Sequence, residues 1–342
     1  MRMLDWETVV IPVRHDRIHA GRVLSYDEHG VVEWETEKRR TAKGSHDCTI
    51  TLRSGGARDA SGKMTELTLS GNITKWIQGH NLFGTSDLTK LLKMAGPRLQ
   101  EIEWLGLDYV GYKRAVKTGN IKINRIDVTE MVQAPCQSDA EQWIRIAGQR
   151  ARTRFHRSST DSGTFYIGKT STSKTFKAYS KFKEIQAHKF PKTFSKPEKK
   201  YLEEWAEGTV RMEWTFRGKW LRSFGIGKLK ELREYGIDRL FREQFETITI
   251  GEVSAVESAQ VIEIDKPLRA TIALWETGID CREHMSRATY YRHKRALLDM
   301  LGVDISQPPN KSNGVVRLSK TINLEPMDVI FDERYSRLFA AI

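Results

Sequence analysis

One segment of this 342-residue chain constrains the fold more than any other, TVRMEWTFRGKWL at positions 209–221. Its apolar side chains recur at every second position: Val210, Met212, Trp214 and Phe216. Period two is the spacing of a β-strand, so one face can be buried while Glu213 lies opposite, between Arg211 and Arg217. Acids are poor strand formers. The segment therefore predicts a strand whose polar face holds a carboxylate that needs a partner.

Other segments extend this pattern into a sheet. Strands are expected at 3–13, 64–72 and 122–132, and hairpins at 21–35 and 163–181. Helical spacing covers 86–102, with an interruption near Gly96 and Pro97, then 138–157, 196–208 and most of 267–302. Hairpins among helices predict an α+β protein with an antiparallel sheet and a small helical C-terminal region. A boundary near 251–266 divides it into residues 1–255 and 256–342.

Composition narrows the class of partner. The net charge is +12 and the pI about 9.5, values typical of a protein that meets a polyanion such as nucleic acid. The three cysteines are far apart, which argues against a zinc site or a disulfide framework. No apolar run is long enough to span a membrane, and no phosphate-binding glycine motif occurs. We expect a soluble, intracellular protein that uses no nucleotide cofactor.

The most basic part of the chain surrounds one tyrosine. Residues 171–200 hold nine lysines and two acids. In TFKAYSKFKEIQAHK (175–189), Tyr179 alternates with Lys177, Lys181 and Lys183, which predicts one open, cationic strand face. Such a face is either a solvated surface or a site where lysines lower the pKa of a tyrosine nucleophile and hold a phosphodiester. The segment by itself favours the solvated surface.

Carboxylates in the middle of strands have two explanations. Asp127, in INRIDVT, shares a face with Arg125, as Glu213 does with Arg211. Each acid either forms a salt bridge with its neighbouring arginine or binds a divalent cation, since hard oxygen ligands suit Mg²⁺ or Mn²⁺. Glu66 and Asp5 are weaker candidates of the same kind. His80, in QGHN, is either a ligand or base, or a turn residue that bonds the backbone.

The C-terminal region contains a second basic element. A helix is expected from Ser286 or Thr289, and its start is crowded with aromatic and basic residues, including Tyr290, Arg292, Lys294 and Arg295. Apolar leucines follow further along. This is how the recognition helix of a helix-turn-helix is built, although many basic amphipathic helices bind no DNA.

Taken together, four segments resemble the replication initiators of filamentous bacteriophages, the gene II protein family. They are WIQGHNLFGTSDL, INRIDVT, SKTFKAYSKFKEIQ and GTVRMEWTFRGKWLRSFGI, within residues 1–250. The resemblance implies an HUH/Rep-like nicking domain, with Tyr179 as the DNA-linked tyrosine and Lys181 beside it. It implies metal binding by Asp127 and Glu213, while the His-hydrophobic-His pair of HUH endonucleases is missing here.

The resemblance implies a mechanism as well. Tyr179 would nick the viral duplex origin, form a 5′-phosphotyrosine link and leave a 3′-OH for rolling-circle replication, and the displaced strand would then be rejoined. His80 and Glu66 are further candidates for catalysis and metal binding, and Lys177, Lys183 and Arg211 for DNA binding. Partners would be viral double- and single-stranded DNA, a host helicase and the replicative polymerase, in the host bacterial cytoplasm. The alternative is a non-catalytic duplex-binding regulator that acts through its C-terminal helix.

Overall fold

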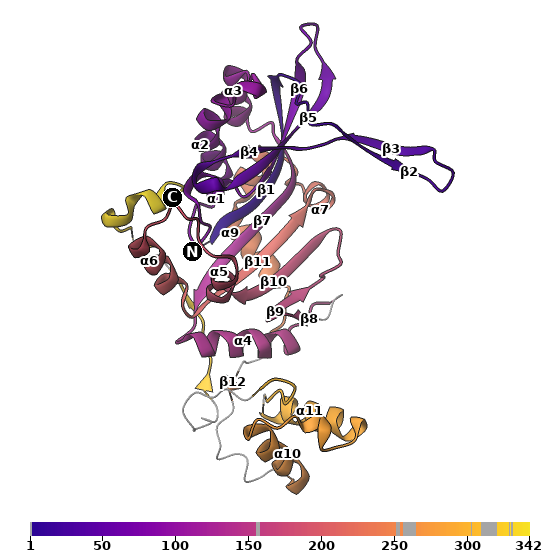
Figure 1. The fold of residues 1–342 in the computed structure, drawn as a ribbon, viewed down its shortest axis with the longest axis vertical. Coiled ribbons are helices and arrows are strands. Elements are labelled where there is room, and N and C mark those ends of the chain that lie inside the picture. The colour runs from indigo at the N-terminus through magenta and orange to yellow at the C-terminus, as the bar shows by residue number, and fades with distance from the viewer. Residues whose placement is uncertain are drawn as a thin grey trace.

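A large antiparallel sheet organises the chain (Figure 1). The computed structural model describes residues 2–154, 158–250, 254–255, 265–301, 303–308, 320–327, 329 and 331–342. The strand order is β4-β5-β6-β1-β7-β11-β10-β9-β8, with β14 beside β7. These strands are β1 Arg2–His15, β4 Arg40–Lys43, β5 Thr49–Arg58, β6 Met64–Gly71, β7 Lys122–Gln133, β8 Ser158–Asp161, β9 Thr164–Ile167, β10 Lys174–Ser180, β11 Thr209–Arg217 and β14 Glu325–Pro326. A separate hairpin, β2 Arg22–Tyr26 and β3 Val32–Glu37, extends away from the sheet, and β12 Ser254–Ala255 pairs with β13 Lys320–Thr321.

Helices begin where the sequence provides caps. The Asp87 side chain accepts hydrogen bonds at the start of α2, and Ser195 forms a capping box with Glu198 at the start of α6. The helices are α1 Ile73–Gln78, α2 Leu88–Gln100, α3 Tyr109–Thr118, α4 Gln137–Arg150, α5 Lys181–His188, α6 Lys196–Ala206, α7 Gly218–Ser223, α8 Leu229–Tyr235, α9 Ile237–Phe245, α10 Lys266–Glu276 and α11 Arg287–Leu301. Short 3₁₀ helices are Ser45–Asp47, Glu103–Leu105, Cys281–Glu283 and Glu333–Phe339.

The main core lies on one face of the sheet. The apolar side chains that alternate along β11 and β10 are buried there with residues of α2, α3, α4 and α9. The opposite face of the same central strands carries Arg211, Glu213 and Asp127, which are also buried. Two-sided burial explains why β11 is enclosed along almost its whole length. These charged groups are therefore largely shielded from solvent.

The end of the chain returns to that charged side. Leu338 and Phe339 pack with Leu82, Phe83 and residues of α5 and α6 in a second core, and the Phe83 and Phe339 rings stack at 4.6 Å. The backbone N–H of Ala341 donates to Oε1 of Gln78 at 2.9 Å. The last residues therefore help to build the N-terminal unit.

A third, small core belongs to the C-terminal helical unit. α10 and α11 enclose Ile272, Trp275, Tyr290, Leu297 and neighbouring apolar residues. α11 begins one residue after Ser286, whose hydroxyl accepts from the backbone N–H of Thr289. Gln149 of α4 donates to Oδ2 of Asp304 at 2.6 Å, which joins this unit to the sheet. The predicted helical region is confirmed.

The α+β class and the antiparallel sheet are confirmed, and several element boundaries were wrong. α2 runs through Gly96 and Pro97 without a break, because Pro97 lies in the last turn, where it costs one hydrogen bond, and Gly96 admits the Tyr112 ring against the helix. β11 ends at Arg217 and α7 follows, while α4 ends at Arg150. The division into 1–255 and 256–342 stays a prediction, since its boundary falls largely on residues outside those described.

The most consequential difference concerns the tyrosine strand. β10 ends at Ser180, whose hydroxyl accepts from the Lys183 backbone N–H and caps α5. Lys181 and Lys183 are therefore helical, and they do not share a strand face with Tyr179. A serine followed three residues later by a free backbone N–H competes with strand extension, and here the cap prevails.

Candidate active site

Strand register gathers the polar residues on one face of the sheet. Tyr179 of β10 lies opposite Arg211 of β11, and Lys177 lies opposite Glu213. Glu213 pairs in turn with Thr129 of β7, two residues from Asp127. Cross-strand neighbours on one face have Cβ atoms about 5 Å apart. The segments that the sequence singled out separately are thus brought together.

The hydroxyl of Tyr179 points at an acid. It lies 3.5 Å from Oε2 of Glu213, and the Lys177 ammonium is 5.1 Å from the centre of the tyrosine ring. Burial raises the pKa of Tyr179 well above its usual value, and the attraction of Arg211 only partly opposes this. The expectation that neighbouring cations lower this pKa was wrong, because desolvation outweighs them.

Glu213 has an unusual proton affinity. Burial, followed by repulsion from Asp5, raises its pKa to about 7, although Lys177 lies 3.0 Å away and Arg211 3.9 Å away. The carboxyl side chain is 1% exposed. A carboxyl group with a pKa near neutrality, next to a hydroxyl, can accept or release a proton at physiological pH.

Asp127 is held by its own arginine. Arg125 binds both carboxylate oxygens, with Nε to Oδ1 at 2.8 Å and Nη2 to Oδ2 at 2.6 Å, and its guanidinium lies over the ring of Trp6. This is the salt bridge that the R-x-D triplet offered as one of its two explanations. For Glu213 the arginine of the triplet is more distant than Lys177.

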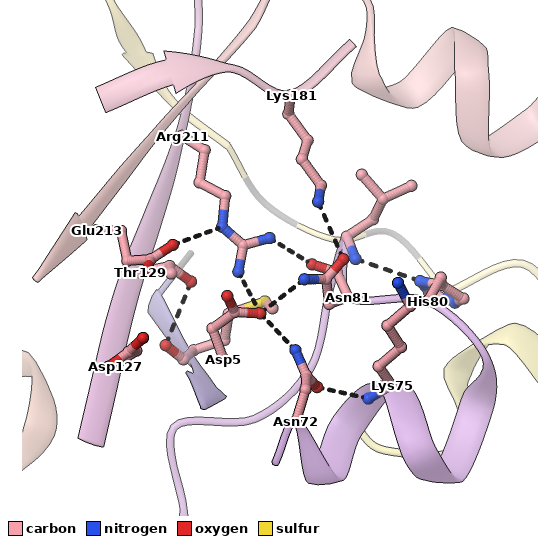
Figure 2. A network of polar contacts seen from close by, with 12 residues as sticks. Asp5, Asn72, Lys75, His80, Asn81, Asp127, Thr129, Lys181, Arg211 and Glu213 are labelled. Atoms are coloured by element: carbon pink, nitrogen blue, oxygen red, sulfur yellow. Dashed lines mark hydrogen bonds and ion pairs between the residues drawn. The ribbon is translucent and has the colours of Figure 1, made fainter. Parts of the chain in front are cut away.

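Asp5 is at the centre of the polar network in Figure 2. Its Oδ1 accepts from Asn72 at 2.6 Å and from Asn81 at 2.7 Å, and it lies 2.6 Å from Nη2 of Arg211. The register of β1 against β7 shifts between Leu4 and Trp6, so Asp5 occupies a β-bulge that turns its side chain towards Arg211. Burial raises the pKa of Asp5, but Arg211, Lys181 and the Asn81 bond together lower it below its usual range.

Asn81 connects this network to α5. Its Oδ1 accepts from Nζ of Lys181 at 3.0 Å, and its backbone carbonyl accepts from Arg211 at 2.7 Å. Lys181 also bonds Glu184 at 2.6 Å and is 1% exposed. Burial, together with repulsion from Arg211, lowers the pKa of Lys181 to about 8. Lys181 is therefore a second group that titrates near neutral pH.

His80 has both ring nitrogens engaged by the backbone. Nε2 lies 2.8 Å from the Leu338 carbonyl, and Nδ1 accepts from the Leu82 N–H at 3.3 Å. Burial lowers the pKa of His80 to about 3, so the ring is neutral. These contacts match the second explanation that the QGHN turn offered, a residue that bonds the backbone.

The remaining candidates lie elsewhere. Glu66 is opposite Pro12 of β1, whereas Asp127 is opposite Trp6, so about 20 Å of strand separates the two acids, and Glu66 pairs with Lys122. Lys183 pairs with Glu141 on the exposed side of α5. Three others lie on α11: Arg292 is exposed, Lys294 pairs with Asp304, and Arg295 pairs with Asp299.

Sequence reasoning missed the importance of Asp5, Asn72 and Asn81. Asp5 was only a weak candidate, because nothing local to β1 reveals the bulge. The sequence did contain a signal for Asn81, since this residue belongs to the QGHN string, but only the histidine of that string was a candidate.

Among the described residues, no three His, Cys, Asp or Glu side chains form a group that could hold a metal ion. No helix within the described ranges is long and apolar enough to cross a membrane.

Comparison with known proteins defines the class. The N-terminal model of the phage replication-associated protein family, the gene II proteins, matches residues 3–237, and the C-terminal model of the same family matches residues 256–329. The chain belongs to this replication-associated protein family of filamentous phages. It is 34% identical to the replication-associated protein of Enterobacteria phage I2-2, over 96% of this chain and 95% of that one. With the replication-associated protein of Enterobacteria phage M13 the identity is 30%, over 44% of this chain and 40% of the relative.

A weaker similarity exists among solved structures. The rolling circle replication initiator protein from Geobacillus stearothermophilus aligns at 11% identity with a TM-score of 0.30, covering 78% of this chain and 89% of that one. A TM-score this low does not establish a common fold. The recognition of the gene II protein family is confirmed by the sequence comparisons.

Proposed function

We propose that this protein is the phage replication initiator that nicks one strand of the viral duplex origin through Tyr179. The observation that carries the proposal is the Tyr179 hydroxyl, 3.5 Å from a buried glutamate on a face where cations could hold a phosphodiester. Family membership supports a role in phage replication. The specific chemistry is inferred from this geometry.

In the proposed step, the Tyr179 oxygen attacks the phosphorus of the scissile phosphodiester. A P–O bond to tyrosine forms, the P–O3′ bond breaks, and the 3′ oxygen leaves as a hydroxyl. The tyrosine proton passes to Glu213, and the leaving oxygen takes a proton from the site. Attack of a 3′-OH on the phosphotyrosine ester later rejoins the displaced strand. The energy of the diester is conserved, so the cycle consumes no nucleotide.

The fixed cations give this face its affinity for phosphate. Lys177 lies between Glu213 and the tyrosine ring, and Arg211 lies directly opposite Tyr179 in the sheet. Desolvated cations stabilise the charge that develops on a phosphoryl group more strongly than exposed ones do. Lys181, with its lowered pKa, is placed near this face as a proton donor.

The donor atoms of this face suit a divalent cation such as Mg²⁺ or Mn²⁺. Glu213 and Asp127 are hard oxygen donors on adjacent strands of one face, and their mutual repulsion contributes to the raised pKa of Glu213. When bound, such an ion polarises the phosphate and neutralises its charge. Glu213 and Asp127 would hold the ion once Lys177 and Arg125 gave way. Glu66 lies too far along β6 to join them.

Binding of the duplex is assigned to the C-terminal unit. Arg292 and Arg295 are exposed on α11, whose apolar side chains pack in a small core. Exposed cations on a helix anchored by a core suit phosphate contacts. In this proposal the protein acts in the host bacterial cytoplasm, where a host helicase opens the nicked duplex and the replicative polymerase extends the 3′-OH.

The test is the capture of a covalent protein–DNA adduct. Supercoiled replicative-form DNA of the phage is incubated with protein and Mg²⁺, and adducts are resolved by denaturing electrophoresis and peptide mapping. Tyr179→Phe should form no adduct, while Tyr166→Phe, a tyrosine opposite Lys177 on the neighbouring strand, should behave as wild type.

Two outcomes would count against the proposal. An adduct that persists in Tyr179→Phe would place the nucleophile elsewhere. If the wild type binds duplex but never nicks it, the non-catalytic duplex-binding regulator becomes the better explanation.

A further inference from the structure

A small basic cavity borders the candidate active site. It lies between the turn that follows α1 and the helix α5, and its volume is about 30 Å³. Its lining includes Lys75, Asn81, Lys181, Glu184, Lys189 and Phe190. Asn81 and Lys181 are shared with the network around Asp5 and Arg211, so the cavity shares one wall with the site.

The cavity has an excess of positive charge. Three ammonium groups line it, from Lys75, Lys181 and Lys189, against one carboxylate, Glu184. The Lys181 ammonium is bonded to Glu184 and Asn81. In the part of the chain that the structure describes, neither Lys75 nor Lys189 forms an ion pair. Within the described residues, the cavity therefore presents two cations that are not paired with a carboxylate.

The unpaired lysines of the cavity differ from two of the lysines that surround Tyr179 in the sequence. Lys177 and Lys183 are each paired with a glutamate, at 3.0 and 2.6 Å. A lysine that already pairs with a carboxylate gains less from a phosphate than an unpaired lysine does, because it exchanges one anionic partner for another. Lys75 and Lys189 incur no such cost, so an anion close to the site gains most beside them.

The backbone at Lys189 supports a specific role. Lys189, the residue that follows α5, has φ +55° and ψ 156°, a conformation that L-residues with side chains rarely adopt. Such strain persists where the surrounding structure enforces it, and it is concentrated at ligand-binding positions. Phe190, which follows, lines the same cavity with an aromatic ring on which a base can stack.

We propose that this cavity binds a backbone phosphate of single-stranded DNA next to the phosphate that Tyr179 attacks. Lys75 and Lys189 contact that phosphate, whose oxygens enter the cavity, and Phe190 receives the adjoining base. This inference rests on the proposed function, because the bound phosphate belongs to the strand that Tyr179 cleaves. That strand would pass over Asn81. A single strand fits better than a duplex, since the cavity is narrow and Tyr179, on the strand that leads into α5, is only partly exposed.

Binding of the full chain to a fluorescein-labelled dT20 oligonucleotide tests the site. Affinity is measured by anisotropy across a salt series for wild type and for Lys75→Ala/Lys189→Ala. The matched control is Lys192→Ala/Lys196→Ala, which removes two exposed lysines of the same segment that lie outside the cavity lining. Equal thermal midpoints show that all three proteins are folded.

The cavity variant should bind dT20 about 5- to 10-fold more weakly near 0.1 M salt, and its salt slope should fall by roughly 1.4, the value for two contacts to a single strand. The control should change affinity less than about twofold. Equal losses in both variants would show a general charge effect and overturn the proposal. An unchanged cavity variant would overturn it too.

Adduct formation separates this inference from the proposed function. At saturating DNA the cavity variant should still form the covalent adduct, because Tyr179 and Glu213 are untouched. If the wild type forms no adduct, while the cavity variant alone loses dT20 affinity, the nicking proposal fails and the phosphate site stands. If adducts form normally and dT20 binding does not change, the nicking proposal stands and the phosphate site fails.

Discussion

The charged side chains of the sheet face and those of α11 differ in their exposure to solvent. On the sheet face, the Arg211 side chain is 0% exposed and lies 2.6 Å from the Asp5 carboxylate. On α11, the Arg295 side chain is 87% exposed, and its pairing with Asp299 spans 3.7 Å. Charges of the first kind cost energy to bury and are held in place by partners, whereas those of the second kind are solvated and screened by salt. The sheet face is therefore suited to chemistry, and the helix to affinity.

Removing a buried charge should have the largest effect on stability. Arg211→Ala leaves the Asp5 carboxylate without its main partner, and we expect a loss of about 3–5 kcal/mol in the free energy of unfolding. Urea denaturation measures it. Arg217→Ala, on the same strand but near its end, is the control and should cost far less. A loss under about 1 kcal/mol for Arg211→Ala would mean that the pair is not effectively buried.

Glu213→Gln should next separate chemistry from binding. It keeps the shape of the side chain but removes the proton acceptor beside Tyr179, so nicking should fall about 10²- to 10³-fold while duplex affinity is retained. Adduct yield and gel retardation measure the two effects. Glu130→Gln, whose carboxylate pairs with Arg2, is the control. A parallel loss of duplex binding would point to a purely structural salt bridge.

The titration of Glu213 predicts a pH-dependent stability. Because its pKa is raised to about 7 from 4.5 on folding, the native state binds more protons between those values, and stability should fall as pH rises through that window. Relative to Glu213→Gln, the wild type should lose roughly 3 kcal/mol between pH 4.5 and 7. Thermal or urea unfolding at about pH 5 and about pH 8, either side of the raised pKa, measures the difference. If the wild type and Glu213→Gln differed by the same free energy of unfolding at both pH values, the raised pKa would be contradicted. If the Glu213 carboxylate binds Mg²⁺, adding the ion should restore stability at the higher pH.

The smallest effect is expected on α11. Arg292→Ala/Arg295→Ala should leave the unfolding midpoint unchanged and weaken duplex binding about tenfold, with the salt slope reduced by roughly 1.8. Lys113→Ala/Lys117→Ala removes the same charge from α3 and serves as the control. If both variants weaken binding equally, α11 has no special role, and the contrast between the two regions is lost.

Much of the fold followed from local pattern. Period-two alternation located β11, β7 and both hairpins, the second of which contains the tyrosine strand, because this pattern depends on neighbours along the chain. Where two local signals competed, prediction failed. The Ser180 cap ended β10 and moved Lys181 and Lys183 onto a helix. The bulge at Asp5 was invisible because it depends on register against β7.

By itself, the sequence determined that Tyr179, Asp127 and Glu213 each lie on the polar face of a strand. Only the tertiary structure decided the direction in which the pKa values of Tyr179 and Glu213 shift. Burial, not neighbouring lysines, sets the pKa of Tyr179, and it brings the pKa of Glu213 near neutrality. It also decided that the end of the chain supports the QGHN turn through Leu338 and Ala341. Desolvation and long-range contacts depend on what packs above a residue, and the order of residues along a strand carries no such information.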